Sequence, residues 1–307
     1  MYHDIVILGV FVADTAYRAD RQPRIGETIM GQAFALGPGG KGSNQAVAAA
    51  MAGGDVGLIT RLGQDTFADM ALRTWAGAGV TPLVTQHADS YTGAAFIFVD
   101  AATGNNAIII APGVAATICV ADVDARADVI AAAKVFVTQL EQPLDAAEHA
   151  MRIARAGGAV TILNPAPAAD LTDAMLALCD YVTPNETEAE ALTGLPVTSV
   201  AEATLAAIAL LARGPKAAII TLGDNGCLYH DGQVAVHVPA IFAGPVVETT
   251  GAGDAFNGGF ATGLADEMDP LTAIRFATAT AAISVTRPGA APSMPSRTEI
   301  DALLARG

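Results

Sequence analysis

The sequence predicts an α/β fold in which a mostly parallel sheet lies between two layers of helices. Short apolar runs such as Ile5–Gly9, Val56–Ile59 and Val135–Thr138 end at glycine, proline or polar residues, and alanine-rich stretches with helical spacing separate them. Continuous apolar strands that alternate with helices are typical of a parallel sheet that is covered on both faces. The hydrophobic fraction of 52% is large enough to fill such a core.

The remaining elements follow the same rhythm along the chain. Further strands are expected at Ala159–Leu163, Tyr181–Thr183 and Ala218–Leu222. Helices are expected at Ser43–Met51, Asp65–Trp75, Leu144–Arg155 and Ala201–Ala212, with two closing helices at Leu271–Val285 and Arg297–Ala305.

One part of the chain departs from this rhythm. Thr92–Val99 and Asn105–Ile110 alternate between apolar and polar residues around a short turn, which predicts a β-hairpin. The residues around Thr15–Leu36 are interrupted by glycine and proline and show no convincing helix. We therefore expect a single domain over residues 1–307, with a small β-sheet lid formed by about 12–37 and 88–112.

Composition excludes several classes of protein. The net charge of −15, from 31 acidic and 16 basic residues, disfavours a nucleic-acid partner, which requires clustered cations. There is no uninterrupted apolar run of 18 residues, so no membrane span is expected, and the N-terminus does not resemble a signal peptide. The three widely spaced cysteines favour reduced thiols and a cytoplasmic location.

The segment ETTGAGDAFNGGF at 248–260 carries the clearest chemical signal. Gly251 and Gly253 permit close approach of a ligand to the backbone, and the apolar pattern that follows predicts a helix. A helix N-terminus presents free N–H groups to an anion, and Asp254 in the first turn is placed to take a proton from a hydroxyl. An ordinary tight turn with a first-turn acid explains the same short motif about equally well.

A second glycine cluster, GPGGKGSNQ at 37–45, also runs into a helix. Gly39, Gly40 and Gly42 let the backbone lie against a ligand, while Lys41 and Asn44 supply groups that suit a polyol. The spacing is not that of a P-loop. The alternative is a plain helix start with Ser43 as the N-cap residue.

Several polar residues follow the ends of predicted strands, where ligands bind in open α/β sheets. They are Asp14, Glu141, Asn185, Glu188 and the turn at 221–226. Taken singly, Glu141 and Glu188 are also explained as solvated acids, and the turn as an ordinary hairpin connection.

Together these segments resemble the ribokinases of the PfkB carbohydrate kinase family, over nearly the whole chain. The resemblance is carried by GGKGSNQA, LNPAPA, TPNETEAE, ITLGDNG, TTGAGDAFNGGF and AIRFATATAAISVTRPGAAPS. It implies a ribokinase-like three-layer α/β/α core with a β lid. It also implies ATP-dependent phosphorylation of the 5-hydroxyl of a pentose, D-ribose in the first instance. The alternatives are a kinase for 2-deoxyribose, another small sugar or a nucleoside, and, against the intact GAGD turn, a non-enzymatic sugar-binding protein.

The resemblance also assigns roles to residues. Asp254 would be the catalytic base, beside an anion hole formed by Gly251, Ala252 and Gly253. The sugar would be held by Asp14, Gly40, Lys41, Asn44, Glu141 and Asp254. The nucleotide would lie against Asn185, Thr221, Gly223, Gly226, Gly253 and Thr278, with Mg²⁺ positioned indirectly by Glu188. A monovalent cation, K⁺, would lie in a loop that comprises Glu248, Thr250, Ser284, Arg287, Gly289 and Ser293.

Two positions depart from the ribokinase pattern. Val12 stands where ribokinases have an asparagine that bonds a sugar hydroxyl, which puts the choice of ribose in question. Glu248 replaces the usual aspartate of the cation loop. By the same resemblance, the lid closes over the sugar and pairs two subunits into a homodimer.

Overall fold

The computed structural model describes residues 2–306, and a nine-stranded sheet forms its centre. The strand order is β13-β12-β11-β10-β9-β8-β1-β4-β5. Pairing is parallel from β5 to β11, whereas β12 and β13 are antiparallel. The strand bounds are β1 (Ile5–Leu8), β4 (Val56–Gly63), β5 (Thr81–His87), β8 (Val135–Thr138), β9 (Val160–Leu163), β10 (Tyr181–Val182), β11 (Ala217–Thr221), β12 (Cys227–His230) and β13 (Ala235–Val238).

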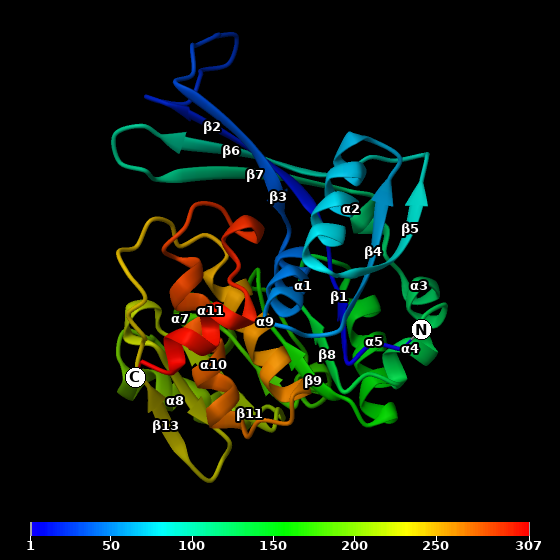
Figure 1. The fold of residues 1–307 in the computed structure, drawn as a ribbon, viewed down its shortest axis with the longest axis vertical. Coiled ribbons are helices and arrows are strands. Elements are labelled where there is room, and N and C mark those ends of the chain that lie inside the picture. Colours follow the sequence, from blue (N-terminus) through cyan, green and yellow to red (C-terminus); the bar gives the residue numbers. More distant parts are fainter. Residues whose placement is uncertain (1, 307) are drawn as a thin grey trace.

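Helices cover both faces of this sheet, because the central strands are apolar on both sides. In β1 the side chains of Ile5 and Ile7 join one apolar cluster, and those of Val6 and Leu8 join another. The first face is covered by α1 (Lys41–Met51), α2 (Thr66–Ala78), α9 (Ala252–Ala265) and α10 (Pro270–Ser284). The second is covered by α3 (Val120–Asp124), α4 (Ala127–Ala131), α5 (Leu144–Gly157), α6 (Asp173–Leu176), α7 (Glu186–Thr193) and α8 (Val200–Leu211), and α11 (Arg297–Leu304) packs against α10 (Figure 1).

The expected three-layer α/β/α fold is thus confirmed, with most element boundaries within two or three residues. The sequence did not predict β5, β12 and β13, or the short α3, α4 and α6. Three single-turn 3₁₀ helices lie at Val114–Thr117, Gly223–Asn225 and Ala291–Ser293. Within residues 2–306, no helix has the length and apolar character that a bilayer span requires.

A second sheet of four strands, in the order β3-β2-β6-β7, projects from one end of the core (Figure 1). Its strands are β2 (Val12–Ala19), β3 (Ala33–Gly39), β6 (Thr92–Asp100) and β7 (Asn106–Gly113). The expected hairpin is the antiparallel pair of β6 and β7, while β2 and β6 run parallel. The two sequence segments that we expected to form a small sheet therefore pair with each other, and we call this sheet the lid sheet.

One face of the lid sheet exposes large apolar side chains. The ring of Tyr17 lies 5.0 Å from that of Phe34 and 5.6 Å from that of Phe96, centroid to centroid. Ile109 lies directly opposite Phe96 in the β6–β7 pair and therefore on the same face, where it is 68% exposed. Single exposed apolar side chains are normal, but a contiguous group of them marks a surface for association.

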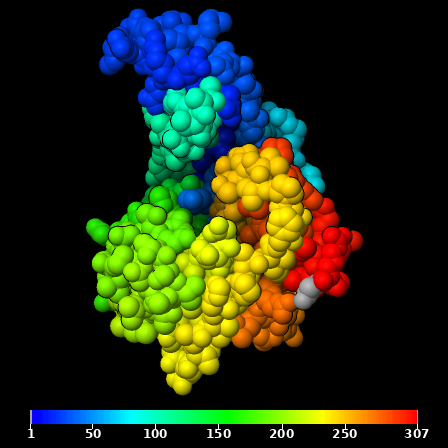
Figure 2. All heavy atoms as spheres, turned by 90° about the vertical axis from the view of Figure 1, so that its left-hand side faces the viewer, coloured from blue at the N-terminus to red at the C-terminus, as the bar shows by residue number. Residues whose placement is uncertain are grey.

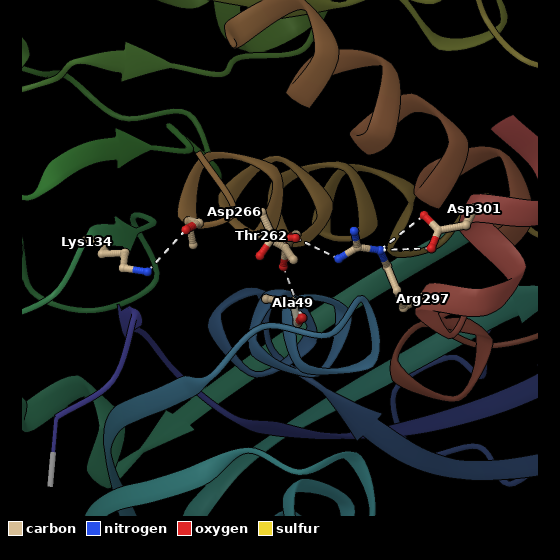
Figure 3. A network of polar contacts seen from close by, with 8 residues as sticks. Ala49, Lys134, Thr262, Asp266, Arg297 and Asp301 are labelled. Carbon is tan, nitrogen blue, oxygen red and sulfur yellow. Dashed lines mark hydrogen bonds and ion pairs between the residues drawn. The ribbon is translucent and has the colours of Figure 1, made fainter. Parts of the chain in front are cut away.

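The position of α9 is fixed by polar contacts to two other helices (Figure 3). The hydroxyl of Thr262 donates to the carbonyl of Ala49 in α1, at 3.1 Å. Asp266, just after α9, accepts a hydrogen bond of 2.6 Å from Arg297, which also bonds Asp301 in α11. The C-terminal end of α9 is therefore held against α1 and α11.

Candidate active site

Several of the predicted site residues follow the carboxyl ends of parallel strands: Glu141 after β8, Asn185 after β10 and Thr221 at the end of β11. Figure 2 shows a recess in the core beneath the lid, with part of the glycine-rich segment near residue 40 in blue at its floor. A cavity of about 260 Å³ lies between the lid and the core. It is lined by Val10, Phe11, Val12, Ile110, Pro112, Ala115, Leu140, Glu141 and Pro167.

Asp254 lies in the first turn of α9, as expected, and is 7% exposed. Its Oδ2 accepts a hydrogen bond of 3.0 Å from Asn44, and its Oδ1 accepts one of 3.0 Å from Gln45. Burial raises the pKa of Asp254, while Lys41 and these two amides act to lower it. A buried carboxylate whose two oxygens are both held has a fixed orientation, which a general base needs.

The turn that precedes Asp254 has the properties of an anion site. Gly251 is the N-cap of α9 with φ 80°, and a Cβ there would lie 2.8 Å from the Cβ of Ala290. A Cβ at Gly253 would meet nothing within 4 Å, so this face of the turn is open. Among the described residues, the backbone N–H groups of Gly253 and Asp254 have no partner, as helix geometry requires of a first turn. These donors are available to a phosphoryl group.

The second glycine cluster forms the sharp corner between β3 and α1. Gly40 is the N-cap of α1 with φ 86°, and a Cβ there would lie 2.5 Å from the carbonyl oxygen of Val10. Ser43 is not the cap residue, contrary to the alternative interpretation. It is buried inside α1, where its hydroxyl accepts a hydrogen bond of 2.9 Å from the indole of Trp75.

Two further carboxylates face the same site and share its buried environment. Asp14 is the third residue of the lid strand β2, and burial raises its pKa to about 6, with Asp254 and Glu248 acting in the same direction. Glu141 follows β8 and accepts a hydrogen bond of 2.8 Å from the backbone N–H of Lys41. Burial raises the pKa of Glu141 to about 7, although that bond and the Lys41 charge oppose the rise. Asp14, Lys41, Asn44, Glu141 and Asp254 are thus close to one another, and of these five Glu141 lines the cavity.

The expected nucleotide residues lie along the neighbouring strand ends. Asn185 is the N-cap of α7 and exchanges hydrogen bonds of 2.8 and 2.9 Å with Glu188. Burial raises the pKa of Glu188, and Asn185 also forms a bridge with Thr221 at the end of β11. Gly223 and Gly226 have positive φ in the turn between β11 and β12, and the buried Thr278 lies in α10. The turn at 221–226 is therefore a hairpin connection that lies beside Asn185.

The residues expected to hold a monovalent cation are only partly gathered. The carboxylate of Glu248 accepts a hydrogen bond of 2.8 Å from the N–H of Gly289, which joins the two loops. The hydroxyls of Ser284 and Ser293 donate to carbonyls of their own turns. Arg287 is paired with Glu299 of α11, and Thr250 lies in the turn before Gly251. Among residues 2–306 there is no cluster of three or more histidine, cysteine or acidic ligands for a metal ion.

Sequence reasoning assigned no role to several buried polar residues beside Asp254. Gln45, Gln139, Asn164, Thr183 and Asn257 are each at most 7% exposed and form hydrogen bonds with one another. Four of them occur in the motifs GGKGSNQA, LNPAPA, TPNETEAE and TTGAGDAFNGGF, so the signal was present. It was not recognised because amides inside a core have no periodic or charge pattern.

Comparison with known proteins agrees with this arrangement. The model of the pfkB family of carbohydrate kinases matches residues 3–297. The chain is 39% identical over 300 residues to a ribokinase of Haemophilus influenzae, with 97% of each chain covered. It is 38% identical over 295 residues to a deoxyribokinase of Salmonella typhi, covering 95% of this chain and 96% of the relative. The structure of Arabidopsis thaliana ribokinase complexed with ribose and ATP matches with a TM-score of 0.92 and 29% identity, and 99% of each chain is covered.

The fold and the site thus define a phosphotransferase that acts on carbohydrates. The chain belongs to the PfkB family of carbohydrate kinases.

Proposed function

We propose that this kinase transfers the γ-phosphoryl group of ATP to the 5-hydroxyl of a pentose, with D-ribose as the first candidate and ribose 5-phosphate as the product. The observation that carries the proposal is the position of Asp254, buried beside the free amides of its own helix N-terminus. The similarity to ribokinases over nearly the whole chain supports the choice of sugar.

The residues of this site suit each step of the transfer. Asp14, Asn44, Lys41 and Glu141 hold the sugar hydroxyls, and Asp254 takes the proton of the 5-hydroxyl as its oxygen attacks the γ-phosphorus. The bond from the γ-phosphorus to the β-γ bridging oxygen breaks, and ADP leaves. The amides of Gly253 and Asp254 stabilise the charge on the phosphoryl oxygens.

Mg²⁺ would enter with the nucleotide. Proteins usually hold this ion with few carboxylates together with the substrate phosphates, so the lone Glu188 beside Asn185 fits a role through bound water. K⁺ would lie in the loop of Glu248, whose link to Gly289 keeps the two loop segments together.

Three further features belong to the same proposal. The lid sheet closes over the cavity and excludes water, within one kinase domain over residues 1–307. The enzyme acts in the cytoplasm.

Two lid sheets pair through the apolar face that contains Tyr17, Phe34 and Phe96, which gives a homodimer. Sedimentation of a Phe34→Glu variant tests the dimer: we expect a monomer, and an unchanged dimer would refute this interface.

A second candidate substrate, 2-deoxyribose, is favoured by one observation. Val12 lines the cavity with Phe11, Ala115 and Leu140, so this wall offers no hydrogen-bond partner to a sugar hydroxyl. The similarity to a deoxyribokinase agrees with this reading.

Coupled measurement of ADP release with a panel of pentoses, hexoses and nucleosides tests the proposed function. We expect kcat/KM to be highest for ribose or 2-deoxyribose, and identification of a 5-phosphate product by NMR confirms the site of transfer. A higher kcat/KM for a hexose or a nucleoside would overturn the proposal.

A further inference from the structure

The amide of Gln45 links Asp254 to a chain of buried polar groups behind it. Its Nε2 donates to Asp254 Oδ1 and to Asn164 Oδ1, each at 3.0 Å. Its Oε1 accepts a hydrogen bond of 2.6 Å from Gln139. Gln45 and Gln139 are 0% exposed, so water does not compete for these contacts.

The orientation of every amide in this chain is determined by a group that cannot reverse its role. Asn164 Nδ2 donates to the backbone carbonyl of Thr183 at 3.1 Å, and a carbonyl can only accept. Asn164 must therefore turn its oxygen toward Gln45, and Gln45 must turn its NH₂ group toward both Asn164 and Asp254. Gln139 is left with its nitrogen toward Gln45. Its oxygen has no hydrogen-bond partner among the described residues and lies 2.4 and 2.9 Å from where Cβ atoms on Gly9 and Gly42 would stand.

The same chain continues to the phosphoryl side of the site. The hydroxyl of Thr183 donates to Asn257 Oδ1 at 2.7 Å, and Asn257 Nδ2 donates to the carbonyl of Gly253 at 2.8 Å. A continuous series of hydrogen bonds therefore runs from the base, through α1, β9 and the end of β10, to the turn that supplies the free amides.

We propose that Gln45 is a positioning residue that keeps Oδ1 of Asp254 turned inward as a fixed hydrogen-bond acceptor, so that Oδ2 alone receives the proton of the sugar hydroxyl. This inference rests on the proposed role of Asp254 as the base. Each carboxylate oxygen accepts one N–H, but the amide of Gln45 is locked by further hydrogen bonds, so a proton on Oδ1 would face its N–H, donor against donor. Among the described residues Asn44 Oδ1 has no hydrogen-bond partner, so the amide of Asn44 can turn that oxygen toward a proton on Oδ2.

The arrangement has a measurable consequence for the ionisation of the base. Gln45 favours the charged form of Asp254, because its N–H bonds the carboxylate. The other charged groups that act on this carboxylate or lie around it are Lys41 of α1, Asp14 of β2, Glu141 after β8, Glu188 of α7 and Glu248. All of them remain when Gln45 is replaced, so a change in pH dependence reports on the amide itself.

The test is the single-turnover rate of phosphoryl transfer as a function of pH in Gln45→Met and Gln45→Glu. Loss of a hydrogen bond to a charged group corresponds to about one to two pH units. We expect the acid limb of the rate profile to move upward by about that amount in Gln45→Met. It should move further in Gln45→Glu, which places a second carboxylate beside Asp254.

Thr262→Val provides the matched control, because it removes another buried hydrogen bond between α9 and α1, to Ala49, without contact to the base (Figure 3). Its acid limb should coincide with that of the native enzyme, even if its melting temperature falls. Either Gln45 variant decides the question, so the test survives if one of them fails to fold.

An unchanged acid limb in a folded Gln45 variant would overturn the positioning role. Such a result would leave the proposed function standing if Asp254→Asn is strongly impaired in the same assay. Near-native phosphoryl transfer by Asp254→Asn would overturn both the role of Asp254 as the base and the positioning role of Gln45, whatever the Gln45 variants show.

Discussion

The floor of the site and the lid sheet above it are built on opposite principles. At the floor, where α1 meets α9, polar side chains are buried and joined by hydrogen bonds, with Gln45 0% and Asp254 7% exposed. In the lid sheet, apolar side chains such as Phe34 and Ile109 are 57% and 68% exposed. The first arrangement holds groups in fixed positions, and the second presents a surface that another surface can cover.

This difference separates the chemistry from the selection of the substrate. The reacting groups come from helices that are tied to each other and to α11, whereas Asp14 and Val12 come from β2 of the lid sheet. Changes at the floor should therefore alter the rate for every substrate, and changes at the base of the lid should alter the ratio between substrates.

The largest effect is expected from Asp254→Asn at the floor. The amide keeps the size of the side chain but cannot accept the proton, so kcat should fall by roughly 10²–10⁴ for every sugar. Binding of ATP and sugar, measured by calorimetry, should change far less. Asp266→Asn, which alters another carboxylate at the end of the same helix, is the control and should retain near-native kcat. Near-native turnover by Asp254→Asn would refute its role as the base.

The buried acid Glu141 should reduce the stability of the unliganded enzyme at neutral pH. Its folded pKa of about 7 lies above its ordinary value of 4.5, so its stabilising contribution is present below pH 4.5 and is lost as the pH rises through 7. Glu141→Gln removes that loss. The free energy of unfolding, measured with urea, should therefore be about 1–3 kcal/mol higher in the variant than in the native enzyme at pH 8, and nearly the same at pH 5. Equal effects at both pH values would contradict the raised pKa.

At the base of the lid, Val12→Asn should change selectivity rather than rate. A new hydrogen bond to a sugar hydroxyl contributes on the order of 1 kcal/mol, so the kcat/KM ratio of ribose to 2-deoxyribose should rise by about fivefold. Val12→Ala keeps the wall apolar and should leave the ratio near that of the native enzyme. A strong native preference for ribose that Val12→Asn does not alter would show that this position does not set specificity.

The smallest effect is expected in the loop of Glu248. Activity with Mg²⁺ and ATP should be higher in K⁺ than in tetramethylammonium at the same ionic strength, and Glu248→Gln should reduce the difference. Glu299→Gln changes an acid that pairs with Arg287 in the same region and is the control. Equal rates in the two salts would show that this loop does not bind an activating cation.

The sequence allowed prediction of the sheet, the lid strands and the individual glycine corners, because apolar periodicity and glycine positions are local signals. Asp254 and Lys41 were recognisable for the same reason, since each lies beside such a corner. Strand β12 and the edge strand β13 were missed because they are short and partly polar. The hydrogen bonds of Gln45 join residues more than 90 positions apart, and no local pattern specifies which buried amide meets which.

The corner between the lid sheet and α1 also determines where this chain tolerates insertions. Gly40 is the single residue between β3 and α1. One residue added there would shift the residues of α1 by one position, which is about 100° of rotation about the helix axis. Lys41 and Asn44 would then point away from the site. The two tips of the lid sheet have no such constraint: Gly26 and Gly104 have no heavy atom within 4 Å of where a Cβ would stand. A peptide tag or a fluorescent reporter inserted at either tip should therefore leave the kinase active, because exposed loop tips accommodate added sequence.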